Sequence, residues 1–356
     1  PRRRGGRTRP ECACRSYSKD KCGDRMGRGC IGGGPLAALV VRILALPGTI
    51  PMDDFQRELG RDLLASVSRS FYLSLKLMPG RVREAASLGY LLARATDTVA
   101  DTEAVAPGRR LELLEEMLGA IVEGAEEPDF GAVAEGSDVS SGEALLLGKF
   151  GRCLEWLAAL PESQRGSVTR VMGPIVKGQS DDLRRFAGIG AASLGSAEEL
   201  EQYTFDVAGC VGVFWTEIGF DAYGSSFASR PREEMEQLGE RFGKGLQLLN
   251  ILRDLPDDLS TGRCYLPGGD ANIGGSSIWG ELAEPWLVRC RELLTAAPTY
   301  VDALRNRRIR LATALPALIA GKTLNLLEQA NWEQLENRVK VPRAEVKRLM
   351  AKAVLV

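Results

Sequence analysis

The chain has 356 residues, of which 44% are hydrophobic, enough for the core of one large domain or two smaller ones. Its formal charges nearly cancel, with 46 Lys and Arg against 47 Asp and Glu. There is no histidine, which excludes histidine-based nucleophilic catalysis, histidine-ligated zinc and imidazole general bases. Any chemistry must use carboxylates, Arg, Lys, Tyr, the backbone or a metal held by oxygen ligands.

Residues 1–51 form a basic leader rich in Arg and Gly, whereas the rest of the chain is mildly acidic. The body therefore lacks the basic field that would bind nucleic acid, and no nucleic-acid partner is expected. Met52 begins an ordinary helical pattern with acids in its first turn. We expect residues 1–51 to be disordered or not to belong to the functional protein, so that a chain starting at Met52 keeps its activity.

Cysteine spacing and hydropathy indicate the cellular compartment of the protein. Four of the eight cysteines lie in the body without paired spacing, which is typical of reduced cytosolic thiols. No segment reaches the roughly 18 uninterrupted apolar residues of a membrane span. We predict a cytoplasmic protein in which membrane contact could only be peripheral, for example through the amphipathic last segment, 342–356.

Apolar residues recur at three- and four-residue steps almost throughout the body, and alternating β-branched runs are scarce. Neither a linker followed by a new pattern nor an internal repeat interrupts this periodicity, so a single all-α domain over 52–356 is predicted. The Gly-, Ser- and acid-rich stretch 124–142 is predicted to be a mobile surface connection. Helices are predicted over 53–77, 81–101, 107–123, 142–159, 162–186, 197–220, 231–255, 279–296, 298–306, 309–329 and 342–354.

Two acids four residues apart, Asp97 and Asp101, occur in the helix-favouring stretch YLLARATDTVAD. This spacing places both carboxylates on one helix face, about one turn apart, with Tyr90 and Arg94 on roughly the same face. Like charges at this spacing destabilise a helix. A hard cation such as Mg²⁺ would reverse that effect, because it binds carboxylates and keeps positions for phosphate oxygens. A single acid pair at this spacing more often lies on a solvated helix face.

A second pair changes that balance. In QLLNILRDLPDD, Asp254 and Asp258 repeat the four-residue spacing and Asn250 lies one turn earlier on the same side. Two acidic helix faces, each with an adjacent Arg, can clamp a diphosphate through Mg²⁺ and guanidinium groups. Pro256 removes one helical hydrogen bond, so the helix is expected to kink or end inside the motif and displace Asp258.

Four separated stretches agree in order and spacing with one family. They are SRSF at 68–71, YLLARATDTVAD at 90–101, Tyr203 with VAGCVG at 207–212, and QLLNILRD followed by GRCYLP. Together they resemble the squalene/phytoene synthase family, most closely its bacterial squalene-synthase-type members, over about Met52 to the C-terminus. The resemblance implies an all-α isoprenoid-synthase-type helical bundle around a central cavity that takes two prenyl diphosphates.

The resemblance also implies roles for individual residues. The expected metal ligands are Asp97, Asp101, Asn250, Asp254 and Asp258. The expected diphosphate contacts are Arg69, Arg94, Gln247 and Arg253. Tyr90 and Tyr203 match tyrosines of the reaction cavity and, with Arg94 and Arg253, are the expected catalytic groups. Asp182 and Arg338 resemble substrate-binding positions, with plain surface charge as the alternative for both.

The implied reaction is a head-to-head condensation of two prenyl diphosphates that depends on Mg²⁺, with Mn²⁺ as an alternative. Joining two farnesyl diphosphates to squalene through presqualene diphosphate is favoured. The allylic cation needs only a dry, cation-tolerant wall, for which the aromatic candidates are Tyr203, Phe205, Phe214 and Trp215. For the last two, core packing is the commoner role. No Rossmann fingerprint occurs, and the use of NADPH is left open.

Three alternatives remain at this stage. A phytoene or dehydrosqualene synthase would perform the condensation without the reduction. A terpene cyclase is disfavoured, because its second metal motif usually has a different Asn/Ser/Glu spacing. A non-catalytic helical scaffold derived from such an enzyme is the alternative from another class. Substrate chain length, oligomeric state and pathway are not determined by the sequence.

Overall fold

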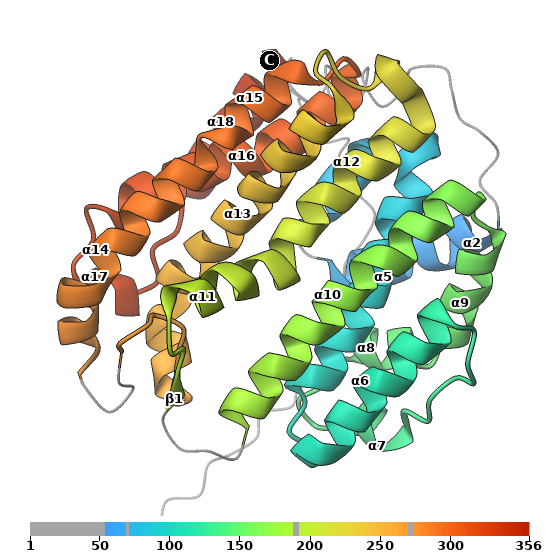
Figure 1. Ribbon diagram of the computed structural model, residues 1–356, viewed down its shortest axis with the longest axis horizontal. Helices are drawn as coiled ribbons and strands as arrows, with labels where there is room; N and C mark the ends of the chain where they lie inside the picture. The colour runs from blue at the N-terminus through green and yellow to red at the C-terminus, as the bar shows by residue number, and fades with distance from the viewer. Residues whose placement is uncertain (1–53, 69–70, 188–191, 270–273, 356) are drawn as a thin grey trace, which may run out of the picture. The chain divides into compact units, whose positions relative to one another are not determined.

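The computed structural model describes residues 54–68, 71–187, 192–269 and 274–355 (Figure 1). These described residues all lie within one compact unit. The expectations for residues 1–51 and for Arg69 lie outside the described residues. Helices make up most of the described chain, and its only strands, β1 and β2, are two residues long and pair in parallel. The predicted all-α fold is confirmed.

The described elements follow one another along the chain with short connections. They are α2 (Asp54–Arg57), the π-helical turn η1 (Glu58–Leu63), α3 (Leu64–Val67), α4 (Phe71–Leu77), α5 (Gly80–Asp101), α6 (Pro107–Val122), α7 (Gly131–Ala134), α8 (Ser141–Leu147), α9 (Phe150–Ala159), α10 (Glu162–Phe186), β1 (Ala192–Ser193), α11 (Ala197–Thr204), the π-helical turn η2 (Phe205–Gly209), α12 (Cys210–Tyr223), the 3₁₀ turn η3 (Gly224–Ser226), α13 (Arg232–Ser260), β2 (Arg263–Cys264), α14 (Gly275–Leu294), α15 (Ala296–Ala303), α16 (Arg307–Leu327), α17 (Trp332–Glu336) and α18 (Arg343–Leu355).

Most long predicted helices are confirmed to within a few residues, and three are divided in the structure. The predicted helix 53–77 is interrupted after Val67, where Ser68 leaves the helical conformation. The predicted helix 142–159 is split into α8 and α9. The predicted helix 197–220 contains the π-helical turn η2. A three- or four-residue apolar repeat does not reveal such breaks, because both flanking pieces keep the same period.

Helix α5 is the central element that carries the first acid pair. Pro79 precedes its first turn, and its buried residues recur at three- and four-residue steps from Val82 to Val99. Beyond Asp101 the chain turns away at Thr102, which adopts an extended conformation. The burial of one face of α5 therefore fixes the direction of its other, acidic face.

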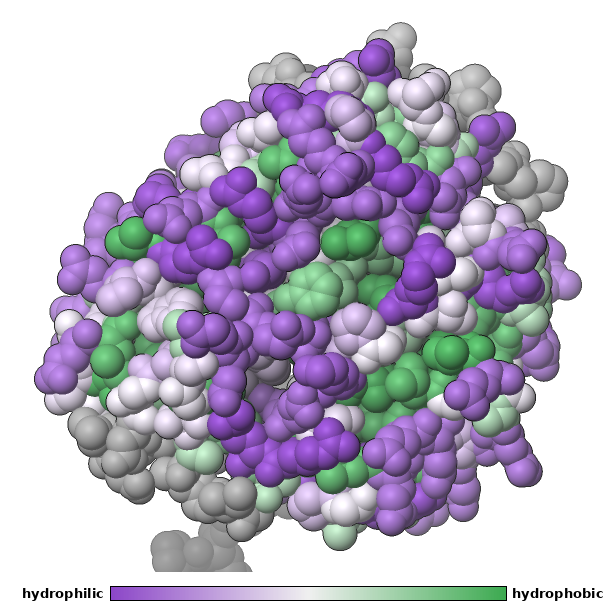
Figure 2. Space-filling model, in the orientation of Figure 1, coloured by the Kyte–Doolittle hydropathy of each residue, from purple (hydrophilic) through white to green (hydrophobic). Residues whose placement is uncertain are grey.

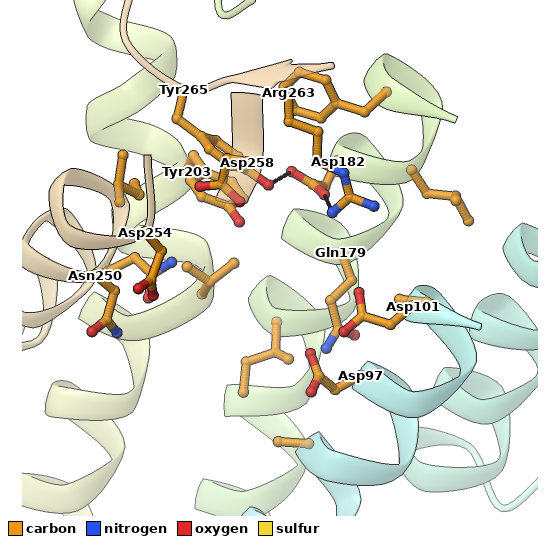
Figure 3. Close-up of a pocket in the computed structure, with 18 of the residues that line it drawn as sticks. Asp97, Asp101, Gln179, Asp182, Tyr203, Asn250, Asp254, Asp258, Arg263 and Tyr265 are labelled. Carbon is orange, nitrogen blue, oxygen red and sulfur yellow. Dashed lines mark hydrogen bonds and ion pairs between the residues drawn. The ribbon is translucent and has the colours of Figure 1, made fainter. Parts of the chain in front are cut away.

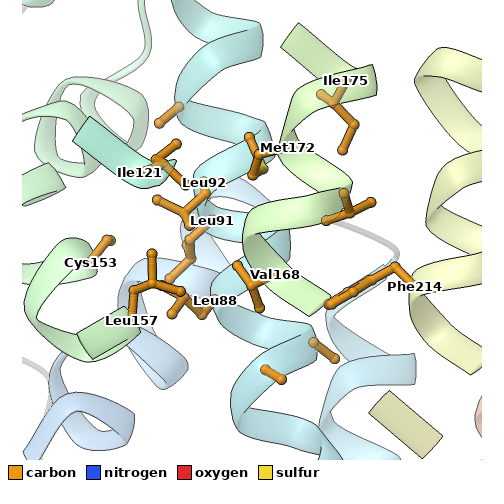
Figure 4. Packing of buried hydrophobic residues seen from close by; sticks show 14 of the residues in the cluster. Leu88, Leu91, Leu92, Ile121, Cys153, Leu157, Val168, Met172, Ile175 and Phe214 are labelled. Carbon is orange, nitrogen blue, oxygen red and sulfur yellow. The ribbon is translucent and has the colours of Figure 1, made fainter. Parts of the chain in front are cut away.

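The main core lies where α5, α6, α9, α10 and α12 meet (Figure 4). Leu88, Leu91 and Leu92 of α5 are fully buried there, together with Val168 of α10. Phe214 of α12 packs against the backbone of Gly89, where an added Cβ would lie 3.0 Å from the ring. The face shown in Figure 2 is mostly hydrophilic, with separate hydrophobic patches, as expected for amphipathic helices.

Four long helices, α5, α10, α12 and α13, lie side by side in a row (Figure 1). The contact between α12 and α13 is made by small residues. A Cβ added to Gly239 of α13 would lie 2.5 Å from the carbonyl oxygen of Gly212, and one added to Gly243 would overlap the carbonyl of Ala208. The stretch VAGCVG therefore serves close backbone packing of η2 and α12 onto α13.

The expectation that α13 ends at Pro256 is wrong. The helix runs from Arg232 through Pro256 to Ser260 and keeps Asp258 within its last turn. Proline removes a single backbone donor. The flanking turns pack against the core through the buried residues Leu252 and Leu255, and this packing offsets the loss.

Two further segments refine the expectations. The stretch 124–142, predicted to be a mobile surface connection, contains the short helix α7, and Phe130 and Val133 are buried in the core. The last helix, α18, packs on α16 and buries Ala353. Among the described residues, no helix has the length and apolar character needed to cross a bilayer.

We predict that Gly239→Ala lowers the melting temperature, because the added methyl group would lie 2.5 Å from the carbonyl oxygen of Gly212. The expected loss is roughly 1–3 kcal/mol, as for other overpacked helix contacts. Gly321→Ala in α16 is the matched control, since nothing lies within 4 Å of its added methyl group. It should stabilise the protein by about 0.5–1 kcal/mol. Thermal unfolding checks both variants, and equal melting temperatures would contradict the packing assigned to Gly239.

Candidate active site

A cavity of about 650 Å³ lies between α5, α10, η2–α12 and α13. Both predicted acid pairs line it: Asp97 and Asp101 from α5, and Asp254 and Asp258 from α13, with Asn250 one turn earlier (Figure 3). The two pairs lie more than 150 residues apart in sequence. The structure thus brings the two acidic helix faces to opposite sides of one cavity.

Arg94 anchors the first acidic face. Its Nη1 donates to Asp97 Oδ2 at 2.5 Å, and its Nη2 donates to Glu143 of α8. Glu143 is itself fixed by a capping box with Ser140 at the start of α8. Tyr90, one turn before Arg94, donates from its hydroxyl to the Val67 carbonyl oxygen at 3.0 Å. Both residues line the cavity.

The acids of α5 are harder to ionise than exposed aspartates. Burial, reinforced by the charge of Asp101, raises the pKa of Asp97 to about 6. Burial also raises the pKa of Asp101, against the opposing charges of Arg263, Arg94 and Arg110. The side chain of Asp97 is 39% accessible, so water reaches it within the cavity.

The second acidic face is built differently. Arg253 donates two hydrogen bonds to its neighbour Asp254, from Nε at 2.8 Å and from Nη2 at 2.5 Å. Burial, together with the charge of Asp254, raises the pKa of Asp258 to about 7. Gln247, one turn before Asn250, also lines the cavity. Near neutral pH, Asp258 is therefore only partly ionised.

A third polar cluster lines the cavity between α10 and the segment that follows β2. Tyr265 donates from its hydroxyl to Asp182 Oδ1 at 2.7 Å, and Arg263 lies 3.6 Å from Asp182 Oδ2 (Figure 3). The ring of Tyr203 stacks on that of Tyr265 with centroids 4.9 Å apart. Burial raises the pKa of Asp182. Asp182 and Tyr203, two of the predicted site residues, thus belong to one connected cluster.

The remaining wall is apolar, and it is supplied by residues that the sequence analysis did not single out. They are Ala93, Ile175, Leu183, Phe186, Val207, Val211 and Ile251. Of the predicted aromatic wall, Tyr203 is present, whereas Phe205, Phe214 and Trp215 are not among the lining residues. Phe214 packs in the main core. Large aromatic side chains within an apolar run usually take this role.

Two predicted substrate contacts are not among the lining residues either. Arg253 is turned onto Asp254, as described above. Arg338 pairs with Asp257 at 2.8 Å, its side chain is 63% exposed, and it adopts a left-handed backbone conformation with φ of 60°. The surface-charge alternative given for Arg338 therefore matches its position. Arg69 lies outside the described residues.

Sequence reasoning assigned no role to four other polar residues that shape the site. Arg263 and Tyr265 lie within the quoted stretch GRCYLP, and Glu143 lies within an S-x-x-E helix start. These local patterns indicate a turn and a cap, not a cavity. Arg110, on α6, also lines the cavity. No short-range signal in the sequence connects Arg110 with the acid pairs, because only the packing of α6 on α5 brings it there.

The donor set is suited to Mg²⁺. Each acidic face offers two carboxylates, and α13 adds the Asn250 amide. Gln179 of α10 lies beside Asp97 and Asp101 (Figure 3), and its amide oxygen is buried without a hydrogen-bond partner among the described residues. No group of three or more acids or cysteines within the described ranges could hold an ion alone. Oxygen ligands that leave positions for water and phosphate are characteristic of magnesium sites.

Fold and site together define an all-α protein in which two acidic helix faces line one cavity. A sequence model of the family described as squalene/phytoene synthase matches residues 64–345. The chain belongs to this family. Its members are prenyltransferases, among them squalene and phytoene synthases.

Two curated relatives show the range of the similarity. The chain is 25% identical over 314 residues to the squalene synthase of Schizosaccharomyces pombe, covering 82% of this chain and 64% of that protein. It is 26% identical over 301 residues to the 15-cis-phytoene synthase of Synechocystis, covering 80% of each. Among solved structures, the squalene synthase TcSQS with a bound ligand has a TM-score of 0.64 at 22% identity, covering 82% of this chain and 84% of that one. This structural likeness supports the fold.

We predict that the metal-free protein loses stability as the pH rises. The folded-state pKa values of about 6 for Asp97 and about 7 for Asp258 lie above the ordinary value of 3.8. The stability that these protonated groups contribute is therefore complete below about pH 4 and is lost as the pH passes through 6 and 7. Asp258→Asn should flatten this decline, measured as melting temperature at about pH 5 and pH 8.

Divalent cations should act in the opposite direction. Mn²⁺ competes with these protons, so its affinity should rise up to about tenfold per pH unit below pH 6 and level off above pH 7. Calorimetric titration across this range tests the expectation. Identical pH slopes in wild type and Asp258→Asn would assign the titration to other groups.

Proposed function

We propose that this chain catalyses the Mg²⁺-dependent, head-to-head condensation of two prenyl diphosphates. The favoured reaction joins two farnesyl diphosphates to squalene through presqualene diphosphate. One observation carries the proposal: two acidic helix faces from α5 and α13 line a single cavity that also has an apolar wall. Membership of a family of prenyltransferases supports it independently.

Each proposed residue has a task that its surroundings support. Asp97 and Asp101 on one side, and Asn250, Asp254 and Asp258 on the other, would hold the cations. Bound Mg²⁺ supplies charge neutralisation for a departing diphosphate. Arg94 is held in place by Asp97 and Glu143, so its guanidinium is already oriented beside the first face. A preorganised charge of this kind stabilises developing negative charge without reorganisation.

The rest of the cavity protects the hydrocarbon part of the substrate. Ile175, Val207 and Val211 offer apolar contact to prenyl chains and exclude water from a carbocation. The face of Tyr203, stacked on Tyr265, provides an aromatic surface toward such a cation, which is worth roughly 0.5–2 kcal/mol. The hydroxyl of Tyr265 is engaged by Asp182, which fixes this pair of rings.

The product is the finer part of the proposal. Relatives that make squalene and phytoene match at almost the same identity, 25% and 26%, so sequence similarity does not choose between them. Mass spectrometry of the lipid formed from farnesyl or geranylgeranyl diphosphate, with and without NADPH, decides. Squalene formed only with NADPH supports the favoured reaction. Dehydrosqualene or phytoene formed without a reductant would replace it.

We predict that Asp97→Asn and Asp254→Asn each lower the rate of diphosphate release on the order of 100-fold, as for the loss of one transition-state contact to developing charge. The matched control is Asp181→Asn, which changes an exposed acid of α10 that pairs with Lys177 and Arg184. Its rate should stay within about twofold of wild type, in line with the small effects of exposed ion pairs. Unchanged release in both cavity variants would favour a non-catalytic helical scaffold.

The limits of the catalytic unit form part of the proposal. We propose that residues 52–356 make up the functional domain, and the family match over 64–345 supports this choice. Comparing the full chain with one that begins at Met52 tests it. Equal activity and solubility are expected, and loss of either would assign a role to residues 1–51. Peripheral membrane contact and a cytoplasmic location remain predictions of the sequence.

A further inference from the structure

Arg110 is a buried arginine whose guanidinium makes one hydrogen bond to the described part of the chain. It lies in the first turn of α6 and is only 8% exposed. Its Nη1 donates to the carbonyl oxygen of Ala100 at 2.8 Å. Its Nε is buried and has no hydrogen-bond partner among the described residues. A guanidinium carries five N–H donors and is rarely buried without a carboxylate to pair with.

Capping of α5 explains only part of this arrangement. Ala100 belongs to the last turn of α5, where carbonyl groups lack helical partners, and one donor is enough to satisfy it. A neutral side chain could do the same at a lower desolvation cost. The charge and the remaining donors of Arg110 therefore need another explanation. Arg110 is one of the residues that line the cavity, so a ligand in the cavity can reach it.

The local charge indicates what the missing partner is. Burial and the charge of Arg263 lower the pKa of Arg110, whereas the charges of Asp101, Glu103 and Asp138 oppose this shift. Two arginines thus act on each other across a region that holds Asp101, and Arg94 adds a third positive charge to that carboxylate. Three guanidinium groups on this side of the cavity give a multiply charged anion several positive partners. Arginine side chains bind the oxygens of phosphate groups in a bidentate manner.

We propose that Arg110 is a substrate-binding residue whose guanidinium takes a phosphate oxygen of the diphosphate held at the Asp97/Asp101 side of the cavity. The inference rests on the proposed function, since it assumes that a diphosphate enters this cavity. It adds a contact from α6, an element that carries neither acid pair. Arg110 thereby links binding of the leaving group to the end of α5, because the same side chain holds the Ala100 carbonyl.

The test uses inorganic diphosphate with Mg²⁺ as the probe, because its binding is measured without turnover. The affinity of the purified full chain is compared with that of Arg110→Met and Arg110→Lys by calorimetry. Arg109→Met is the matched control. It removes the same charge from the same helix, but Arg109 pairs with Glu112 and Glu116 on the exposed side. Melting temperatures without ligand report how much capping of α5 each variant has lost.

Arg110→Met should weaken diphosphate binding about tenfold or more, as expected for the loss of charge-assisted hydrogen bonds. Arg110→Lys should weaken it several-fold, since an ammonium cannot replace the planar fork. Arg109→Met should change it less than twofold. With prenyl diphosphate as substrate, both Arg110 variants should raise KM more than they lower kcat, which a loss of stability alone would not do.

Two outcomes distinguish failure of the role proposed for Arg110 from failure of the proposed function. If wild type fails to bind magnesium diphosphate, the proposed function fails first. If wild type binds it and the Arg110 variants bind as tightly, Arg110 only caps α5 and the inference is overturned. Should Arg110→Met not fold, Arg110→Lys decides alone, and an unchanged affinity in that variant overturns the inference.

Discussion

The constraint on which this molecule depends is the concentration of carboxylates within one cavity. Asp97 and Asp101 face Asp254 and Asp258, and burial raises the pKa values of three of these four acids. The metal-free fold tolerates them through protons and through nearby arginines. Under the proposed function, divalent cations and their phosphate ligands would take the place of these protons.

Helix packing is what creates this concentration. Helix α13 approaches η2 and α12 closely only because Gly239 and Gly243 lack side chains. This contact sets the position of the acidic end of α13, while the leucine-rich face of α5 sets that of the first pair. The same packing brings α6 onto α5 and carries Arg110 into the cavity. Residues remote from the chemistry therefore determine its geometry, as in other preorganised sites.

The sequence was most informative where periodicity is local and least informative where neighbours decide. Four-residue spacing placed each acid pair on one helix face, and the structure agrees. Pro256 was expected to end α13, yet core contacts on both sides keep the helix intact. Phe214 was considered for the cavity wall but packs in the core. Arg338 resembled a substrate contact and lies exposed beside Asp257. Sequence spacing shows which helix face a side chain is on, but not whether that face meets the core, the cavity or solvent.

The sequence by itself determined the fold class, both acid pairs, the absence of imidazole chemistry and the resemblance to a family. These depend on composition and on short-range repeats, which are legible without coordinates. Only the tertiary structure decided that the two pairs share one cavity and that Arg263, Tyr265 and Arg110 join them there. Long-range packing brings these groups together. Burial can shift a pKa or leave a hydrogen-bond donor without a partner only once the chain has folded.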